Sequence, residues 1–141
     1  MRWLFLMGLL ITPAVAADLS TDGENAGTTA IVQSLKRSGN AVTLRFTIVN
    51  DSNQSLSGNL LSGHDTFTAD GSYLVDTTGK KKYEIIRDSD GHCICSQRIP
   101  NFQPKSSANL WAKFPAPPDS VTKIGVNIPH FIPLDDVPIT E

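Results

Sequence analysis

Residues 41–50 form the most regular stretch of the chain and read Ala-Val-Thr-Leu-Arg-Phe-Thr-Ile-Val-Asn. Apolar side chains alternate there with Thr43, Arg45 and Thr47. Successive side chains of a β-strand point to opposite faces of a sheet, so a period of two indicates a strand with one buried face. The side chains predicted to face the core are Val42, Leu44, Phe46 and Ile48.

The segments around this strand show further short β-like patterns. Residues 28–36 precede it across a Ser-Gly-Asn turn, which predicts an antiparallel hairpin. No segment shows a sustained apolar period of about 3.6 residues, the pattern of an amphipathic helix. Further strands are predicted at residues 56–61, 73–76, 81–87, 92–96, 108–112 and 121–128, with an edge-strand fragment at most within 131–139.

Short strands separated by regular turn signals are typical of all-β proteins. About seven to eight such strands predict an antiparallel β-sandwich of immunoglobulin type, and an open barrel is the alternative. No repeat, linker or second domain is evident in the sequence.

The beginning of the chain has the three-part layout of a secretory signal peptide. Arg2 precedes an apolar run over residues 3–11, and Pro13 and the small residues Ala14-Val15-Ala16 follow. The apolar run is much shorter than the roughly 20 residues of a membrane-spanning helix. We therefore expect a signal peptide at 1–16, a flexible leader at 17–27 and one exported domain at 28–141, periplasmic or secreted.

Composition limits the classes of partner. The chain has 141 residues with 12 Lys and Arg against 14 Asp and Glu, a formal net charge of −2. Because no large basic patch appears in the sequence, we expect no nucleic-acid partner, and we expect no membrane-spanning segment in the exported domain.

Cys93-Ile94-Cys95 contains the only two cysteines of the chain. Residues two apart in a strand share a face with Cα atoms about 6.6 Å apart, at the far limit for a disulfide, so the backbone must bend to close one. Gly91 and Ser96 allow that bend, and an exported chain folds in an oxidising compartment. We predict a local disulfide. Its three-residue loop is worth only about 1.6 kcal/mol, so its expected role is to fix the corner.

The alternative function is a small periplasmic protein that binds copper or zinc through Cys93 and Cys95. Copper(I) accepts two thiolates, whereas zinc needs two further ligands. His92 points away from Cys93 in a strand, so His64 or His130 would have to fold over the pair. One Cys-x-Cys is weak evidence for such a site, and we expect neither a metal nor another cofactor.

No motif in the sequence indicates catalysis. Asp88-Ser89-Asp90-Gly91 resembles the start of a calcium loop, but the twelfth position would be Ile99 instead of a glutamate. This segment therefore predicts a tight turn in which Asp side chains accept backbone N–H bonds. Nucleophile, Cys-x-x-Cys and phosphate-binding motifs do not occur in the sequence, and we expect no catalytic residues.

Trp111 is predicted to face solvent, because Leu110 and Ala112 alternate with it toward the core. The proline-rich segment Phe114-Pro115-Ala116-Pro117-Pro118 follows and ends the strand. An exposed tryptophan beside prolines is compatible with a partner-binding patch of Trp111, Phe114 and Pro117. The alternative is that Trp111 covers the sheet or packs on the prolines.

Several phrases together resemble a family. They are Tyr-Leu-Val-Asp at 73–76, Arg-Asp-Ser-Asp-Gly-His-Cys-Ile-Cys-Ser at 87–96, Leu-Trp-Ala-Lys-Phe-Pro-Ala-Pro-Pro at 110–118 and Ile-Pro-His-Phe at 128–131. They resemble an exported bacterial Ig-like β-sandwich domain of envelope proteins, found alone or ahead of OmpA-like modules. The resemblance implies a fold and an envelope location but carries no activity.

The expected function follows from these features. We expect an exported, non-enzymatic Ig-like module with a binding or scaffolding role in the bacterial cell envelope or outside the cell. Its expected partner is an envelope or extracellular protein. A third hypothesis is an inhibitor whose proline-rich loops contact an enzyme.

Overall fold

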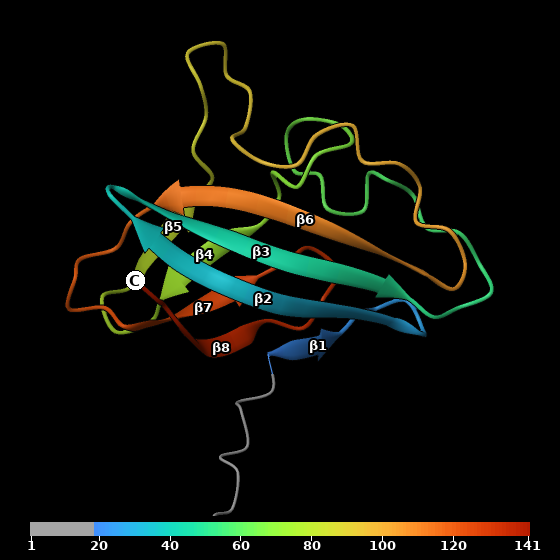
Figure 1. Ribbon diagram of the computed structural model, residues 1–141, viewed down its shortest axis with the longest axis horizontal. Coiled ribbons are helices and arrows are strands. Elements are labelled where there is room, and N and C mark those ends of the chain that lie inside the picture. Colours follow the sequence, from blue (N-terminus) through green and yellow to red (C-terminus); the bar gives the residue numbers. More distant parts are fainter. Residues whose placement is uncertain (1–18) are drawn as a thin grey trace, which may run out of the picture.

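The computed structural model describes residues 19–141. Within these residues, eight strands form two antiparallel four-stranded sheets, and there is no helix (Figure 1). The strand orders are β1-β2-β3-β6 and β5-β4-β7-β8. The all-β architecture predicted from the sequence is therefore confirmed, whereas the predicted signal peptide lies outside the described residues. The strands are β1 (Ser20–Asp22), β2 (Thr28–Ser38), β3 (Ala41–Asn50), β4 (Tyr73–Asp76), β5 (Lys81–Glu84), β6 (Ser106–Pro115), β7 (Lys123–Asn127) and β8 (Leu134–Pro138).

The predicted hairpin of β2 and β3 forms the centre of the first sheet. The four side chains of β3 that were predicted to face the core are at most 1 % exposed. The pattern of β2 is less regular because a β-bulge lies between Val32 and Ser34. A bulge inserts one extra residue and changes which side chains face inward. Ala30 and Val32 are buried before it, and Leu35 is buried after it.

The hydrophobic core lies between the two sheets and extends under the loops. β6 contributes Leu110 and Ala112, which alternate with outward-facing residues as predicted, and Phe114, which was predicted to lie in a partner-binding patch but is buried. Side chains of the second sheet face them. They are Leu74 of β4, Tyr83 of β5, Ile124 and Val126 of β7, and Val137 of β8.

Part of the segment predicted to be a flexible leader, residues 17–27, forms a strand instead. Its residues Ser20–Asp22 form β1, which pairs antiparallel with β2. Its side chains are exposed or half-buried, so backbone hydrogen bonds hold this edge strand. A polar strand of this kind leaves no alternating pattern in the sequence.

The strand predicted at residues 56–61 is not present. Leu56 makes only an isolated bridge with Phe102, and turns follow it. Leu61 is fully buried all the same. A side chain at Gly58 would collide with the carbonyl oxygen of Ile99, so glycine allows this close backbone approach.

A short segment extends the first sheet beyond β6. Residues 86–94 form a hairpin that projects from the sheets, in yellow in Figure 1. Beyond it, the N–H of Ser96 donates to the carbonyl of Trp111 over 2.9 Å, and the N–H of Lys113 donates to the carbonyl of Ile94 over 3.0 Å. Residues 94–96 therefore run antiparallel to β6 and cover part of its edge.

Asn50 connects the loops at one end of the sandwich. Its side chain is fully buried, and its Nδ2 group donates to the carbonyls of Gln54, Phe102 and Gln103 over 2.8 to 3.1 Å. Its Oδ1 atom accepts the backbone N–H of Ser52. One amide thus satisfies carbonyls from two loops that are distant in sequence.

We expect Asn50→Leu to lower the free energy of unfolding by about 2–4 kcal/mol, because buried carbonyl groups lose their donor. Urea denaturation of the full chain measures the change. Asn53 is exposed, so Asn53→Leu is the matched control and should change stability by less than about 0.5 kcal/mol. Equal effects of the two substitutions would contradict this role for Asn50.

Candidate functional site

The carboxylate of Asp70 organises the long connection between β3 and β4. Its side chain is fully buried. Oδ1 accepts the N–H of Gly63 over 2.7 Å, and Oδ2 accepts those of His64 and Asp65 over 3.1 and 2.8 Å. Arg87 donates to the same Oδ2 over 2.9 Å. Four donors therefore hold one carboxylate, and the loop is folded around it.

Arg87 ties this loop to the projecting hairpin. Its Nη1 group donates to Asp65 and to the carbonyl of Gly91, both over 3.1 Å, while its Nη2 group binds Asp70. Burial alone would raise the pKa of Asp70, but hydrogen bonds from the backbone of Asp65 and Gly63 and from Arg87 lower it to about 2. The hydrogen bond to Asp70 in turn raises the pKa of Arg87.

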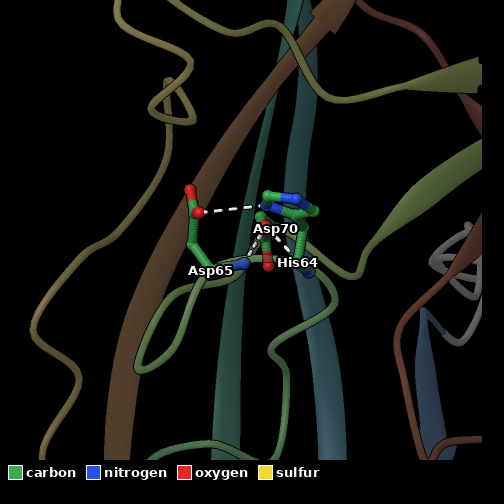
Figure 2. Close-up of side chains that lie close together, drawn as sticks. All are labelled: His64, Asp65 and Asp70. Carbon is green, nitrogen blue, oxygen red and sulfur yellow. Dashed lines mark hydrogen bonds and ion pairs between the residues drawn. The ribbon is translucent and has the colours of Figure 1, made fainter.

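His64, Asp65 and Asp70 lie close enough to suggest a metal site (Figure 2). His64 Nδ1 lies 3.2 Å from a carboxylate oxygen of Asp65, but the imidazole is largely exposed. Both oxygens of Asp70 already accept hydrogen bonds, and the guanidinium of Arg87 lies within 3.1 Å of both carboxylates. A divalent cation would be repelled by this guanidinium. The cluster is therefore a structural clamp rather than a metal centre.

The acidic turn before the cysteines has the predicted geometry. Asp88 Oδ1 accepts the N–H groups of Asp90 and His92, each over 2.9 Å. Gly91 adopts a φ of 85°, a value that favours glycine. The side chains of Asp88, Asp90 and His92 are exposed, and the turn itself accounts for their proximity.

The predicted cysteine pair is brought together at the end of this hairpin. The Sγ atoms of Cys93 and Cys95 lie at disulfide-bonding distance, with their Cα atoms 5.3 Å apart. Both residues are buried, and Cys95 lies opposite Ala112 of β6. The expected bend is therefore present, and the pair sits where the hairpin joins the first sheet.

The predicted partner-binding residues separate into two groups. Trp111 lies on the outer side of β6 and is only half-buried, as the alternation predicted. Phe114 is fully buried in the core, and Pro117 is buried beneath the end of β2, where Arg37 donates to its carbonyl. Neither is accessible to a partner, so of the three predicted patch residues only Trp111 lies at the surface.

Trp111 borders two hollows, which also share Asn109 and Leu110 as lining residues. The first measures about 610 Å³ and lies between β6 and residues 93–100. The second measures about 360 Å³ and is lined by Gln33, Arg45 and Asn109. Arg98 borders the first hollow with a φ of 53°. Residues other than glycine rarely adopt this conformation, and such residues cluster at functional sites.

Sequence reasoning missed most of the residues around Trp111. Gln33, Arg45 and Asn109 come from three different strands, and only sheet pairing brings them to one face. Arg45 could have been found, because it occupies an outward position of the most regular strand and pairs directly with Trp111. Arg98 follows the cysteine segment in a loop and carries no sequence signal.

No family model, curated protein or solved structure matches this chain. The resemblance to exported Ig-like envelope domains therefore stays a prediction. Among the elements within residues 19–141, none is a helix of the length and apolar character that crossing a membrane requires.

The clamp at Asp70 predicts acid sensitivity. Its pKa is about 2 in the fold, below the ordinary value of 3.8 for an aspartate, so its ionised form stabilises the fold above pH 3.8. This contribution, about 2 kcal/mol, is lost as the pH falls from about 5 through about 2. We expect Asp70→Asn to cost about 2–4 kcal/mol at pH 6, and the difference from the unmodified protein to shrink by about 2 kcal/mol at pH 2.

Urea denaturation over this pH range measures the difference. Asp135 is exposed, so Asp135→Asn is the matched control and should leave the pH profile almost unchanged. A profile for Asp70→Asn that runs parallel to that of the unmodified protein would show that this carboxyl does not carry the acid sensitivity.

The cysteine pair predicts a small, local effect of reduction. Opening a three-residue loop is expected to lower the free energy of unfolding by about 1.6 kcal/mol. Urea denaturation with and without reductant measures this loss, and the double variant Cys93→Ala/Cys95→Ala should be insensitive to reductant. A decrease in the free energy of unfolding of more than about 4 kcal/mol would contradict this local role, because the disulfide would then stabilise the whole domain.

Proposed function

We propose that this protein is an exported, non-enzymatic Ig-like module that binds a component of the cell envelope or the extracellular space through the surface around Trp111. The observation that carries the proposal is the position of this tryptophan. It is half-buried on the solvent side of a sheet, where it lines two hollows, rather than in the core. Partly exposed tryptophans in such positions are frequent at binding sites.

The strand order supports the Ig-like part of the proposal. With residues 94–96 added, the first sheet reads β1-β2-β3-β6-(94–96), and apart from the extra edge strand β1 this is the A-B-E-D order of immunoglobulin domains. The second sheet, β5-β4-β7-β8, corresponds to C′-C-F-G. The cysteines lie two residues apart instead of bridging the sheets, so the domain lacks the disulfide of antibody domains.

The chemistry of Asp70 and of the cysteine pair fits a non-enzymatic role. Asp70 is held ionised by four donors and is not poised to accept a proton near neutral pH. A disulfide at Cys93 and Cys95 fits an oxidising compartment and leaves no free thiolate for the alternative copper or zinc site.

Co-sedimentation of the full chain with an isolated bacterial envelope fraction tests the proposal. We expect Trp111→Ala to reduce the affinity, taken from the bound fraction at a series of envelope concentrations, at least about tenfold, because an aromatic anchor at a binding site is worth more than about 1.4 kcal/mol. Tyr73 is a half-buried aromatic residue of the second sheet, so Tyr73→Ala is the matched control and should bind like the unmodified protein.

Urea denaturation of each variant separates loss of binding from loss of folding. If the Trp111→Ala variant does not fold, Trp111→Phe replaces it, because phenylalanine keeps an aromatic ring at this position. Binding that is equal with and without the Trp111 side chain in folded variants would overturn the proposal.

A further inference from the structure

The outward side chains of β2, β3 and β6 around Trp111 form a surface that we call the Trp111 face. Across it runs a polar ladder in which Gln33 Nε2 donates to Thr47 Oγ1 over 3.2 Å and Thr47 donates to Asn109 over 2.7 Å. In the part of the chain that the structure describes, the Nδ2 group of Asn109 has no protein acceptor. Planar amides are thus fixed beside the indole ring and can bond a ligand's hydroxyl groups.

The Trp111 face is basic in an acidic protein. β2, β3 and β6 contain no Asp or Glu, whereas the whole chain has a formal charge of −2. Lys36, Arg45 and Lys113 lie on these strands, and among residues 19–141 none of the three takes part in an ion pair. Arg98 adds a fourth cation at the border of the larger hollow, and Asp88 contributes one carboxylate there, so cations still outnumber anions. The charge favours an anionic ligand.

The face is too polar for the centre of a typical protein interface. Such centres are apolar and rich in large hydrophobic side chains. Within the described residues, the exposed large hydrophobic side chains are Phe67 and Ile132, and neither lies on β2, β3 or β6. One aromatic ring surrounded by amides and cations fits a ligand with apolar C–H faces, hydroxyl edges and negative charges.

We propose that the Trp111 face binds an acidic polysaccharide whose sugar units carry carboxylates. One sugar ring stacks on Trp111, and its neighbours along the chain occupy the two hollows. Asn109 and Gln33 bond hydroxyl groups, and Arg45, which pairs directly with Trp111 in the sheet, binds a carboxylate. This inference rests on the proposed function and replaces the protein partner expected from the sequence with a glycan.

Binding of a defined oligogalacturonate to the full chain, measured by calorimetry, tests the inference. The methyl-esterified form of the same oligosaccharide is the matched neutral ligand, and polyglutamate is the matched polyanion. We expect the acidic oligosaccharide to bind more tightly than both and to weaken with added salt. Equal binding of polyglutamate would overturn the inference, because the Trp111 face would then recognise negative charge alone and not a sugar.

Two variants identify the residues. Trp111→Ala should weaken binding of the acidic oligosaccharide at least about tenfold, and Trp111→Phe should restore part of it. Arg45→Gln should weaken the acidic ligand about threefold and leave the esterified one unchanged. Lys123 lies on the second sheet, so Lys123→Gln is the charge-matched control and should have no effect beyond that of net charge.

The outcome separates this inference from the proposed function. If the envelope fraction binds through Trp111, but protease treatment abolishes that binding and oligogalacturonate does not bind, the partner is a protein and the glycan inference is wrong. If Trp111 matters for neither the envelope fraction nor the oligosaccharide, both proposals fail.

Discussion

The carboxylate of Asp70 is the constraint on which the irregular half of this molecule depends. Residues 51–72 connect β3 to β4 without a named strand, so sheet ladders cannot satisfy their backbone N–H groups. Three of those groups point at one buried carboxylate, and Arg87 balances its charge. Since Arg87 also binds the carbonyl of Gly91, the same interaction fixes the hairpin whose far end reaches β6. The loop and the hairpin therefore hold their positions together.

The sequence predicts the strands whose side chains alternate and misses those that depend on the backbone alone. The period of two placed β3, β6 and β7 correctly, because burial of one face repeats along each strand. β1 has no buried face, so nothing in Ser20–Asp22 marked its pairing with β2. In residues 56–61 the leucines reflected burial under a loop, which apolar side chains cannot distinguish from a strand.

The part of the candidate site that was predictable depends only on the alternation of side chains along one strand. Trp111 faces outward for that reason, and the same rule places Phe114, three residues later, on the inner side. The burial of Pro117 was not predictable, because it follows from Arg37, which lies 80 residues earlier and donates to its carbonyl. The contact of Arg87 with Asp70 likewise joins residues 17 apart that share no motif.

The short disulfide acquires a role from its position rather than from its energy. A three-residue loop contributes little to global stability. Yet Cys93 and Cys95 fix the segment that pairs with β6 and forms one wall of the larger hollow. That added segment also makes β6 an inner strand along Trp111, so the indole lies within a sheet rather than on its edge. A surface held this rigidly loses little conformational entropy when a ligand binds, which favours recognition by a small domain with few apolar contacts to offer.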